Sequence, residues 1–527
     1  MRHDLEFRSI PAMVRASASR FADGEALADL DDGRRWSFRE VADEMVRAAR
    51  AVRALGVKPG DRVAVWGPNC PEWIFAALGV QAAGGVLVPL NTRFKAAEAE
   101  YILRKSGAGT VFTVTGFLGV DYLGMLPEGV RAVVMRGKAT GGALGWEEFL
   151  ALGERVDERA VLGVIEGLGP DDVSDIMFTS GTTGRPKGVV LGHGQSLRAY
   201  GWLSDVFTFG PGDRFLIIPP FFHTFGYKAG WLACLMQGVT TLPQPVFDTG
   251  RVLERIERER VSILLGPPTL FEDLMRHPRR AAHDLSSLRV TVPSATTVAA
   301  DLVRRLSSVL GFEVVLTAYG LTESTSLVTS SHPGDDVEDI VNSVGVPADG
   351  LEVKVVGPDG AELPPGGEGE VLVRGYTVMR GYWDEPEESA RVVDADGWLH
   401  TGDIGRFNDR GFLAIVDRIK DMFICGGFNA YPAEIERLLG AHPSVAEVAV
   451  IGVPDERMGE VGAAFVVRGD ASLTEEELVA WVREHMANYK APRRIAFVDT
   501  LPRNASMKVE KGRLRALLVE RPADSLE

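Results

Sequence analysis

A ten-residue stretch combines the residue types that bind phosphate groups. Residues 179–188 read Thr-Ser-Gly-Thr-Thr-Gly-Arg-Pro-Lys-Gly, between the apolar runs 176–178 and 189–191. Glycines let several backbone N–H groups turn toward one point, and the hydroxyls and the lysine add donors, so we expect a loop that binds the phosphates of a nucleotide. It is not the P-loop pattern, because no Ser or Thr follows the lysine. A flexible surface loop is the alternative. The candidate ligands are Thr179, Ser180, Gly181, Thr182, Thr183, Gly184 and Lys187.

Two later segments carry carboxylates in patterns that suit a nucleotide. The run 318–323 follows the apolar residues 314–316, and ligands bind at the C-terminal ends of parallel strands. Tyr319 offers a face for a base, and Glu323 offers a hard oxygen for Mg²⁺. Asp403, in a Thr-Gly-Asp string, can accept both ribose hydroxyls. Taken singly, each segment is better explained as a surface turn with an acidic residue.

In this order the segments resemble the motifs of the adenylate-forming superfamily, which includes acyl-CoA synthetases, luciferases and nonribosomal peptide adenylation domains. The resemblance implies a two-step reaction. The carboxylate of a small-molecule acid attacks the α-phosphate of MgATP, giving an acyl-adenylate and pyrophosphate, and the CoA thiol then displaces AMP. ATP, Mg²⁺ and CoA are the implied cofactors, and Thr179 and Glu323 the implied catalytic metal ligands. The implied nucleotide contacts are Ala318, Tyr319, Gly320, Leu321, Thr322, Asp403 and Ile415.

The resemblance also identifies an acid-binding segment, residues 219–226. Amino-acid-activating domains usually place an Asp where this chain has His223, so His223 implies a hydrophobic acid without an α-amino group. Without the resemblance, His223 is better explained as a hydrogen-bonded histidine in an aromatic core corner. Residues 221–230 look like actinobacterial ligases that act on propanoate side chains of partly degraded steroid rings. Residues 293–297, which include the implied contacts Ser294, Ala295 and Thr296, replace a usual Gly/Ala-rich stretch with larger, hydroxylated side chains, which predicts a smaller or more polar pocket.

The last motifs lie near the C-terminus. Arg418 is implied to contact ribose or phosphate, and Lys420 to act as a hinge. The glycine loop Gly426, Gly427 and Phe428 is implied to bind CoA and to lead into a helix at Pro432. Lys508 stands at the catalytic lysine position, where a cation can bridge the carboxylate and the α-phosphate. Because Lys508 and the glycine loop share one small domain, we expect that domain to rotate about Lys420 between the two steps.

Composition limits the partners. The 527 residues carry a net charge of −16, which argues against nucleic acid. No apolar run is long enough for a membrane span, and the N-terminus lacks a signal-peptide core. Three distant cysteines suggest neither a metal site nor disulfides, so we expect a cytoplasmic protein. No pattern in the sequence indicates an oligomeric state.

The elements predict an α/β fold. Strand-like and helical stretches alternate up to about residue 340, as in helix-covered parallel sheets. Strand-like runs include 62–66, 86–88, 111–114, 215–218 and 262–265. Short strands with Gly/Pro turns then indicate a small antiparallel β-barrel. We expect an N-terminal domain, residues 1–416, for ATP and the acid, and a mobile α+β C-terminal domain, residues 417–527.

Three other functions remain open from the sequence. A standalone enzyme that loads a carrier protein would share the first step, although no carrier segment is visible and the chain ends 19 residues after Lys508. A luciferase-like oxygenase is a second alternative. A non-catalytic nucleotide-binding regulator is the third, and the joint presence of Lys187, Glu323, Asp403 and Lys508 argues against it.

Overall fold

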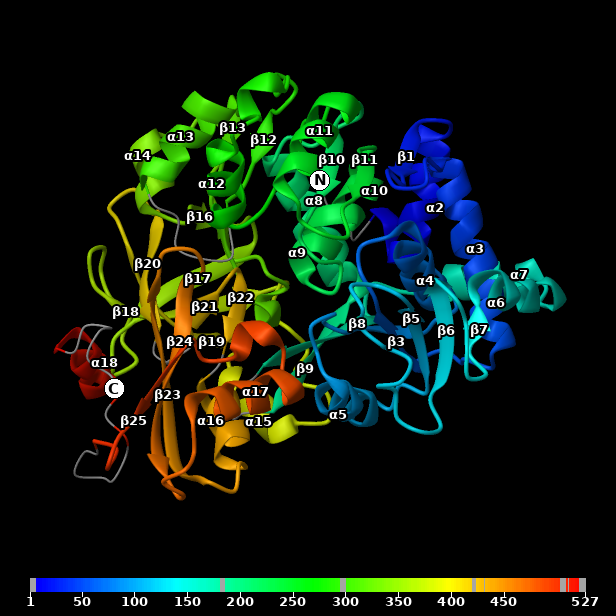
Figure 1. The fold of residues 1–527 in the computed structure, drawn as a ribbon. Helices are drawn as coiled ribbons and strands as arrows, with labels where there is room; N and C mark the ends of the chain where they lie inside the picture. The colour runs from blue at the N-terminus through cyan, green and yellow to red at the C-terminus, as the bar shows by residue number, and fades with distance from the viewer. Residues whose placement is uncertain are drawn as a thin grey trace. The chain divides into compact units, whose positions relative to one another are not determined.

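The computed structural model describes residues 6–180, 185–293, 300–418, 423–430, 432–502, 509 and 511–520. Figure 1 labels its helices and strands. The chain divides into two compact units. The first unit comprises Met1–Thr92, Ile102–Phe178 and Gly188–Asp417, and the second comprises Arg93–Tyr101, Thr179–Lys187 and Arg418–Glu527.

A seven-stranded sheet in the spatial order β7-β6-β5-β3-β4-β8-β9 dominates the N-terminal part of the chain. Its strands are β3 (Arg62–Trp66), β4 (Val86–Pro89), β5 (Thr110–Val114), β6 (Arg131–Arg136), β7 (Leu144–Gly145), β8 (Val173–Ser180) and β9 (Pro186–Gly192). In this spatial order, each pair of neighbouring strands from β7 at the edge to β8 is parallel. The runs β3 and β5 are almost wholly buried, as expected for parallel strands covered on both faces.

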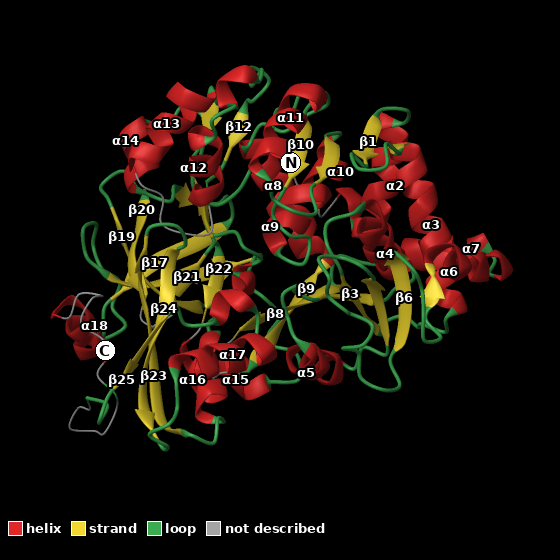
Figure 2. Cartoon of the chain, in the orientation of Figure 1, coloured by secondary structure: helices red, strands yellow, loops and turns green. Residues whose placement is uncertain are grey.

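Helices cover this sheet. They are α2 (Ile10–Phe21), α3 (Phe38–Ala54), α4 (Pro71–Ala82), α5 (Ala96–Ser106), α6 (Trp146–Leu152), η1 (Gly153–Arg155) and α7 (Glu158–Gly167). Figure 2 shows α2, α3 and α4 grouped beside β3 and β6. Ser37 begins α3 with a capping box: its hydroxyl accepts the Glu40 N–H at 3.2 Å, and the Glu40 carboxylate accepts the Ser37 N–H at 2.7 Å.

A second sheet has the order β10-β11-β1-β2. Its strands are β1 (Glu25–Ala28), β2 (Arg35–Ser37), β10 (Arg214–Ile217) and β11 (Thr240–Pro243), and β12 (Val290–Thr291) pairs with β13 (Val314–Val315). The strand predicted at 262–265 is reduced to bridges of Ile263 to Phe215 and Val290. The surrounding helices are α8 (His193–Val206), α9 (Thr224–Gly226), the π-helix η2 (Tyr227–Leu232), α10 (Ala233–Gln237), α11 (Thr249–Glu259), α12 (Pro268–Arg276), η3 (Arg280–Ala282), α13 (Ala300–Leu310) and α14 (Val337–Asn342).

The predicted antiparallel layer is a half-barrel. It contains the four-stranded sheet β17 (Leu351–Val356), β18 (Gly369–Gly375), β19 (Leu399–Phe407) and β20 (Leu413–Arg418), and the three-stranded sheet β14 (Ala318–Tyr319), β15 (Thr329–Ser330) and β16 (Val346–Pro347). The short helices η4 (Thr322–Ser324) and α15 (Pro386–Val392) belong to the same region of the chain. Buried valines and Leu413 form its core, against which Tyr319, Leu321 and Ile415 pack.

The C-terminal part of the second unit is an α+β structure. Its strands are β21 (Phe423–Cys425), β22 (Phe428–Ala430), β23 (Val445–Asp455), β24 (Gly459–Arg468) and β25 (Arg494–Phe497), in a sheet of order β22-β21-β24-β23 with β25 parallel to β24. Its helices are α16 (Pro432–Gly440), α17 (Glu475–His485), η5 (Asn488–Lys490) and α18 (Lys511–Glu520). The predicted α/β fold class is thereby confirmed.

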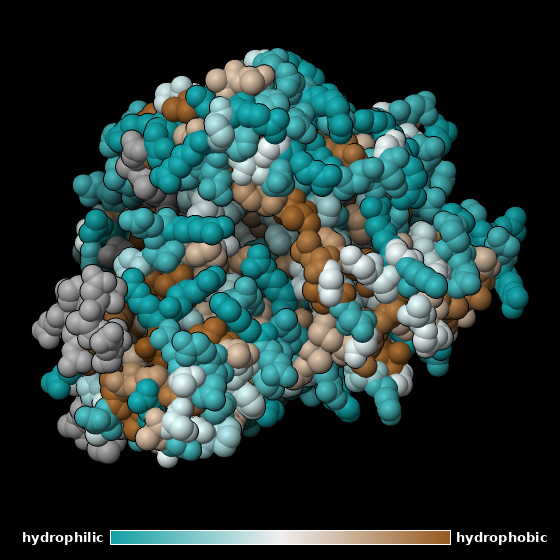
Figure 3. Space-filling view, viewed as in Figure 1, coloured by the Kyte–Doolittle hydropathy of each residue, from teal (hydrophilic) through white to brown (hydrophobic). Residues whose placement is uncertain are grey.

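On the face shown in Figure 3, hydrophilic residues cover most of the surface. Cys70, Cys234 and Cys425 are all buried and unpaired. Across the described ranges, no helix is both long enough and apolar enough to cross a membrane.

Candidate active site

The candidate phosphate loop connects two neighbouring strands. Thr179 and Ser180 are the last residues of β8, and β9 begins at Pro186, so both strands extend further than predicted. Lys187, the second residue of β9, is buried. Thr179 and Lys187 therefore lie at the facing ends of adjacent strands. The side chain of Ser180 is outside the described residues, and so are Gly181, Thr182, Thr183 and Gly184.

The Tyr319–Glu323 motif is a tightly folded loop. Tyr319 ends β14, and Glu323 lies in η4. A Cβ atom on Gly320 would lie 2.2 Å from the backbone carbon of Ser326, so only glycine fits there. Thr325 and Ser326 have φ values of 54° and 57°, a conformation that costs energy for residues other than glycine. The chain thus folds back sharply, with strain, directly after Glu323.

Two contacts anchor Glu323. Its backbone oxygen accepts the Met379 N–H at 2.7 Å, and its Oε1 accepts the Tyr382 hydroxyl at 3.0 Å. Among the described residues, no group of three or more His, Cys, Asp or Glu side chains is placed to hold a metal ion. A nucleotide-bound Mg²⁺ commonly takes one or two carboxylates and completes its shell with phosphates and water. A single anchored carboxylate such as Glu323 fits that kind of site.

Asp403 lies on a β-bulge within β19, a strand that the sequence does not predict. Glu370 pairs with Ile404 and Leu372 with His400, so residues 401–403 face only Val371 on β18. Gly402, in the bulge, has a φ of 72°. A bulge bends the strand and re-aims its side chains, and bulges are enriched next to active sites.

Hydrogen bonds join the base and ribose candidates. The Tyr319 hydroxyl donates to Asp403 Oδ2 at 2.5 Å, and Asp403 is buried. On the far side of the bulge, Glu370 Oε1 accepts the Gly402 N–H at 3.1 Å, and Glu370 Oε2 lies 3.0 Å from His400 Nδ1. Glu370 was not identified from the sequence, because its partners are cross-strand neighbours about 30 residues away.

The candidate acid-binding segment, residues 219–226, follows β10. Asn69 fixes its start: the Asn69 amide donates to the Pro219 oxygen at 2.9 Å and accepts the Phe221 N–H at 2.8 Å. His223 is exposed, and its Nδ1 accepts the Phe225 N–H at 3.3 Å. The neutral ring therefore carries its proton on Nε2, which is left as a donor.

The candidate acid-binding segment touches the turn that directly follows the Tyr319–Glu323 motif. Thr224 Oγ1 lies 2.6 Å from Ser326 Oγ, although the two residues are 102 positions apart. The Tyr200 hydroxyl, on α8, donates to the Thr325 oxygen at 2.9 Å. The structure thus brings His223 and Glu323, which the sequence separates by a hundred residues, to segments in direct contact.

The glycine loop predicted at residues 426–428 is shorter than expected, because Phe428 is the first residue of β22. Cys425 pairs with Phe428, so Gly426 and Gly427 are the turn of a β-hairpin. Their φ values of 57° and 80° fit the type I′ turn that two-residue hairpins favour. The helix predicted at Pro432 is confirmed as α16. Residues 428–430, which follow the glycines, are therefore strand rather than loop.

Ala318, Leu321, Thr322 and Ile415 are half-buried in the half-barrel region. The side chain of Arg418 lies outside the described residues, as do Lys420, Ser294, Ala295, Thr296 and Lys508.

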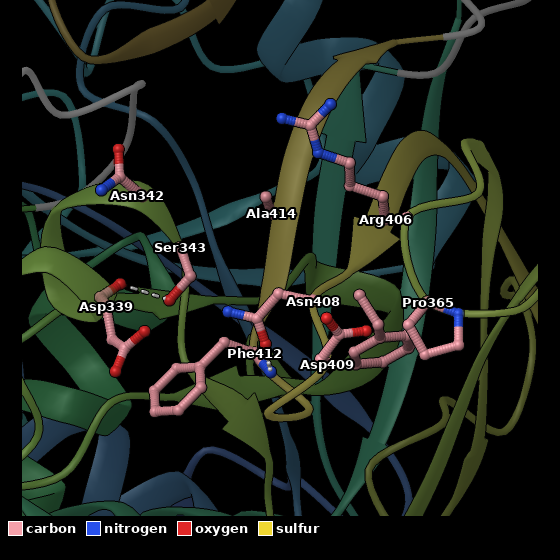
Figure 4. A pocket seen from close by; sticks show the side chains of 11 residues that line it. Asp339, Asn342, Ser343, Pro365, Arg406, Asn408, Asp409, Phe412 and Ala414 are labelled. Atoms are coloured by element: carbon pink, nitrogen blue, oxygen red, sulfur yellow. Dashed lines mark hydrogen bonds between the residues drawn. The ribbon is translucent and has the colours of Figure 1, made fainter.

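An open cavity of about 390 Å³ lies beside the turn between β19 and β20 (Figure 4). Ala414 of β20 lines it, and successive strand residues point to opposite faces, so it lies on the other face of β20 from Ile415. None of the predicted site residues within the described ranges lines it. The lining residues are Asp339, Asn342, Ser343, Pro365, Gly366, Arg406, Phe407, Asn408, Asp409, Phe412 and Ala414.

Comparisons with known proteins agree along the whole chain. Residues 14–383 match the model of the AMP-binding enzymes, and residues 434–508 match the C-terminal domain of AMP-binding enzymes. A (7a-methyl-1,5-dioxo-octahydro-1H-inden-4-yl)propanoyl:CoA ligase from Mycobacterium tuberculosis is 46% identical over 97% of this chain and 99% of its own. The ligase of the same name from Rhodococcus jostii is 45% identical over 96% and 98%. Among solved structures, the o-succinylbenzoate CoA synthetase of Bacillus subtilis, bound to a product analogue, has a TM-score of 0.81 at 28% identity, covering 96% of this chain and 98% of its own.

Proposed function

This chain belongs to the AMP-binding enzyme family and is an AMP-forming acid–CoA ligase, and we propose that its acid is a propanoate side chain on a fused alicyclic ring system. Two relatives of full-length similarity carry names that specify such an acid, a propanoate on a two-ring diketone. The wall behind the acid-binding segment is apolar: Trp73 packs edge-on against Phe221 at 5.5 Å between ring centroids. A largely hydrophobic acid suits that wall.

The observation that carries the adenylation step is the contact between the acid-binding segment and the nucleotide motifs. Through Thr224 and Ser326, the segment that presents His223 touches the loop that presents Glu323. In the step that we propose, a carboxylate oxygen of the acid attacks the α-phosphorus, and pyrophosphate leaves with the cleaved P–O bond. The CoA sulfur then attacks the acyl carbon, and AMP leaves with the C–O bond.

We assign roles to the residues on that basis. Tyr319 stacks on the base, and Asp403 accepts from the ribose hydroxyls. Thr179 and Lys187 bind phosphates, and His223, with Nε2 as a donor, faces the acid. For the residues beyond the described ranges, the roles given by the motifs stand: Lys508 as the catalytic cation, and Lys420 as the hinge of a functional domain 417–527.

Mg²⁺ is part of the proposal. Glu323 would hold it, with Thr179 as a second ligand, and its charge would offset that of the phosphates when bound. The chain's own contribution is the anchored position of the Glu323 carboxylate, fixed by Tyr382 and Met379. A cytoplasmic location likewise stays a proposal based on composition.

The experiment is ATP–pyrophosphate exchange with a panel of acids, followed by thioester formation. The panel contains propanoates on fused alicyclic rings, aryl acids, straight-chain fatty acids and amino acids. We expect the alicyclic propanoates to give the highest kcat/KM, and free CoA to be acylated in preference to a carrier protein. Faster exchange with amino acids would refute the acid class. Acylation of a carrier protein but not of CoA would favour the carrier-loading alternative.

A further inference from the structure

A fully buried lysine follows the acid-binding segment. Lys228 is the second residue of the π-helix η2, two positions after Gly226. Its Nζ lies 2.9 Å from Asp175 Oδ1 and donates to Ser196 Oγ at 2.8 Å. None of these three side chains is exposed to solvent. Lys228 therefore cannot contact an acid in solution, and its role must be exerted through its partners.

Asp175 connects this lysine to the strand that leads into the phosphate loop. It lies on β8, four residues before Thr179, and alternate residues of a strand share a face. Its Oδ2 accepts the Ser174 hydroxyl at 2.6 Å. The ion pair thus joins the end of the acid-binding segment to the strand on which Thr179 stands.

Stability alone is a weak reason for such a pair. Removing two charges from water is costly, and apolar side chains of similar volume often replace a buried ion pair at no loss. Burial lowers the pKa of Lys228, and the Asp175 charge opposes that shift. The pair is, however, short, and it fixes the distance between the two elements. Short π-helices also occur frequently at functional sites.

We propose that Lys228 and Asp175 are positioning residues for adenylation, holding the acid-binding segment at a fixed place relative to strand β8. This inference rests on the proposed function, because it assumes that residues 219–226 bind the acid. If the pair is removed, the carboxylate of the acid substrate is held less accurately, while the Tyr319–Asp403 contact is unaffected. The acid KM should therefore rise more than the ATP KM.

The test compares Lys228→Met, Asp175→Leu and the double variant in ATP–pyrophosphate exchange, with thermal unfolding of each. The single variants each leave one buried charge unpaired and should lose Tm. The double variant should regain most of that loss, because no unpaired charge remains. We expect its acid KM to stay at least about tenfold above wild type, with the ATP KM within about twofold, since small misplacements of a substrate cost large factors.

Arg255→Met is the matched control. Arg255 is also buried, and it binds Gln244 and Asp31 on other elements. If Arg255→Met raises the acid KM as much at an equal loss of Tm, the pair is merely structural and the inference is wrong. Recovery of the wild-type acid KM in the double variant, or an equal rise of both KM values, would also overturn it. Absence of exchange by the wild-type enzyme with every acid would instead refute the proposed function.

Discussion

The loop that carries Glu323 and the segment that carries His223 meet at the contact between Thr224 and Ser326, yet they are held by different means. On the nucleotide side, local backbone distortions shape the chain, namely the Gly402 bulge and the positive φ values of Thr325 and Ser326, while Tyr382 and Met379 anchor Glu323 from outside its loop. On the acid side, buried long-range contacts do it, from Asn69 and from the Lys228–Asp175 pair.

This difference has a physical consequence. A distorted backbone depends on a few residues with special conformations, so single substitutions there should change nucleotide binding with a limited loss of stability. Buried polar groups depend on the whole surrounding core, because each unpaired group carries a desolvation penalty. Substitutions on the acid side should therefore cost both stability and acid binding.

The largest expected effect is a loss of folding stability at low pH that is caused by the buried residue His193. His193, the first residue of α8, is buried and accepts the Ile10 N–H at 3.3 Å. Burial lowers the pKa of His193 to about 3, whereas an unfolded histidine titrates near 6.5. Below pH 6.5 the His193 side chain binds a proton in the unfolded chain but not in the folded chain. The contribution of His193 to the unfolding free energy is therefore constant above pH 6.5, and the unfolding free energy falls by up to about 1.4 kcal/mol per pH unit between pH 6.5 and pH 3.

Chemical denaturation at pH 7.5, 6, 5 and 4 measures this slope. In His193→Asn, which lacks the titrating ring, the unfolding free energy should fall less steeply between pH 6.5 and 4. The difference between the two slopes should correspond to roughly one bound proton. Parallel pH curves for the two proteins would show that His193 does not supply the effect.

The next largest effect is expected for Gly320→Ala on the nucleotide side. The new Cβ would meet the Ser326 backbone, which cannot move away as a side chain can. We expect a loss of about 1–3 kcal/mol in unfolding free energy, as for other overpacked sites, and a rise of about tenfold or more in the ATP KM. Gly109→Ala is the control, since a Cβ at Gly109 meets nothing within 4 Å. An unchanged ATP KM in Gly320→Ala would contradict the tight-loop account.

A smaller effect is expected for Glu370→Gln. The carboxylate holds Gly402 and His400, and the amide keeps the shape but loses the charge-assisted bonds. The ATP KM should rise about three- to tenfold, corresponding to roughly 0.7–1.4 kcal/mol, with the acid KM unchanged. Glu352→Gln, on β17 of the same sheet and paired with exposed Arg374, should change neither. A rise in the acid KM of Glu370→Gln would contradict the division between an acid side and a nucleotide side.

Much of the nucleotide side could be predicted from the sequence, because short motifs carry it. Tyr319, Glu323 and Asp403 were identified by residue type and order, and the structure joins Tyr319 to Asp403 directly. Their backbone shapes could not be predicted. The Gly402 bulge depends on the register between β18 and β19, and the hairpin at Gly426 depends on pairing between β21 and β22.

The acid side was predictable only in part. His223 was identified through its motif, but Asn69 lies in a bend before α4, Ser196 in α8 and Asp175 in β8, and no local pattern marks them. Lys228 lies within the run 221–230 that resembles actinobacterial ligases, but its residue type there does not indicate that it is buried and paired with Asp175. Tertiary packing decides whether such a residue is solvated or buried. Tertiary packing also decides how a strand pairs: the apolar pattern of residues 262–265 predicts a strand, but these residues form only isolated bridges.

The most direct test of the account is a crossed titration of acid and ATP in pyrophosphate exchange, for His223→Ala and Asp403→Asn. If the two sides are held independently, His223→Ala should raise the acid KM about tenfold or more and leave the ATP KM within about twofold, and Asp403→Asn should do the reverse. If both variants raise both KM values by equal factors, the two segments act as one rigid site, and the division between an acid side and a nucleotide side is wrong.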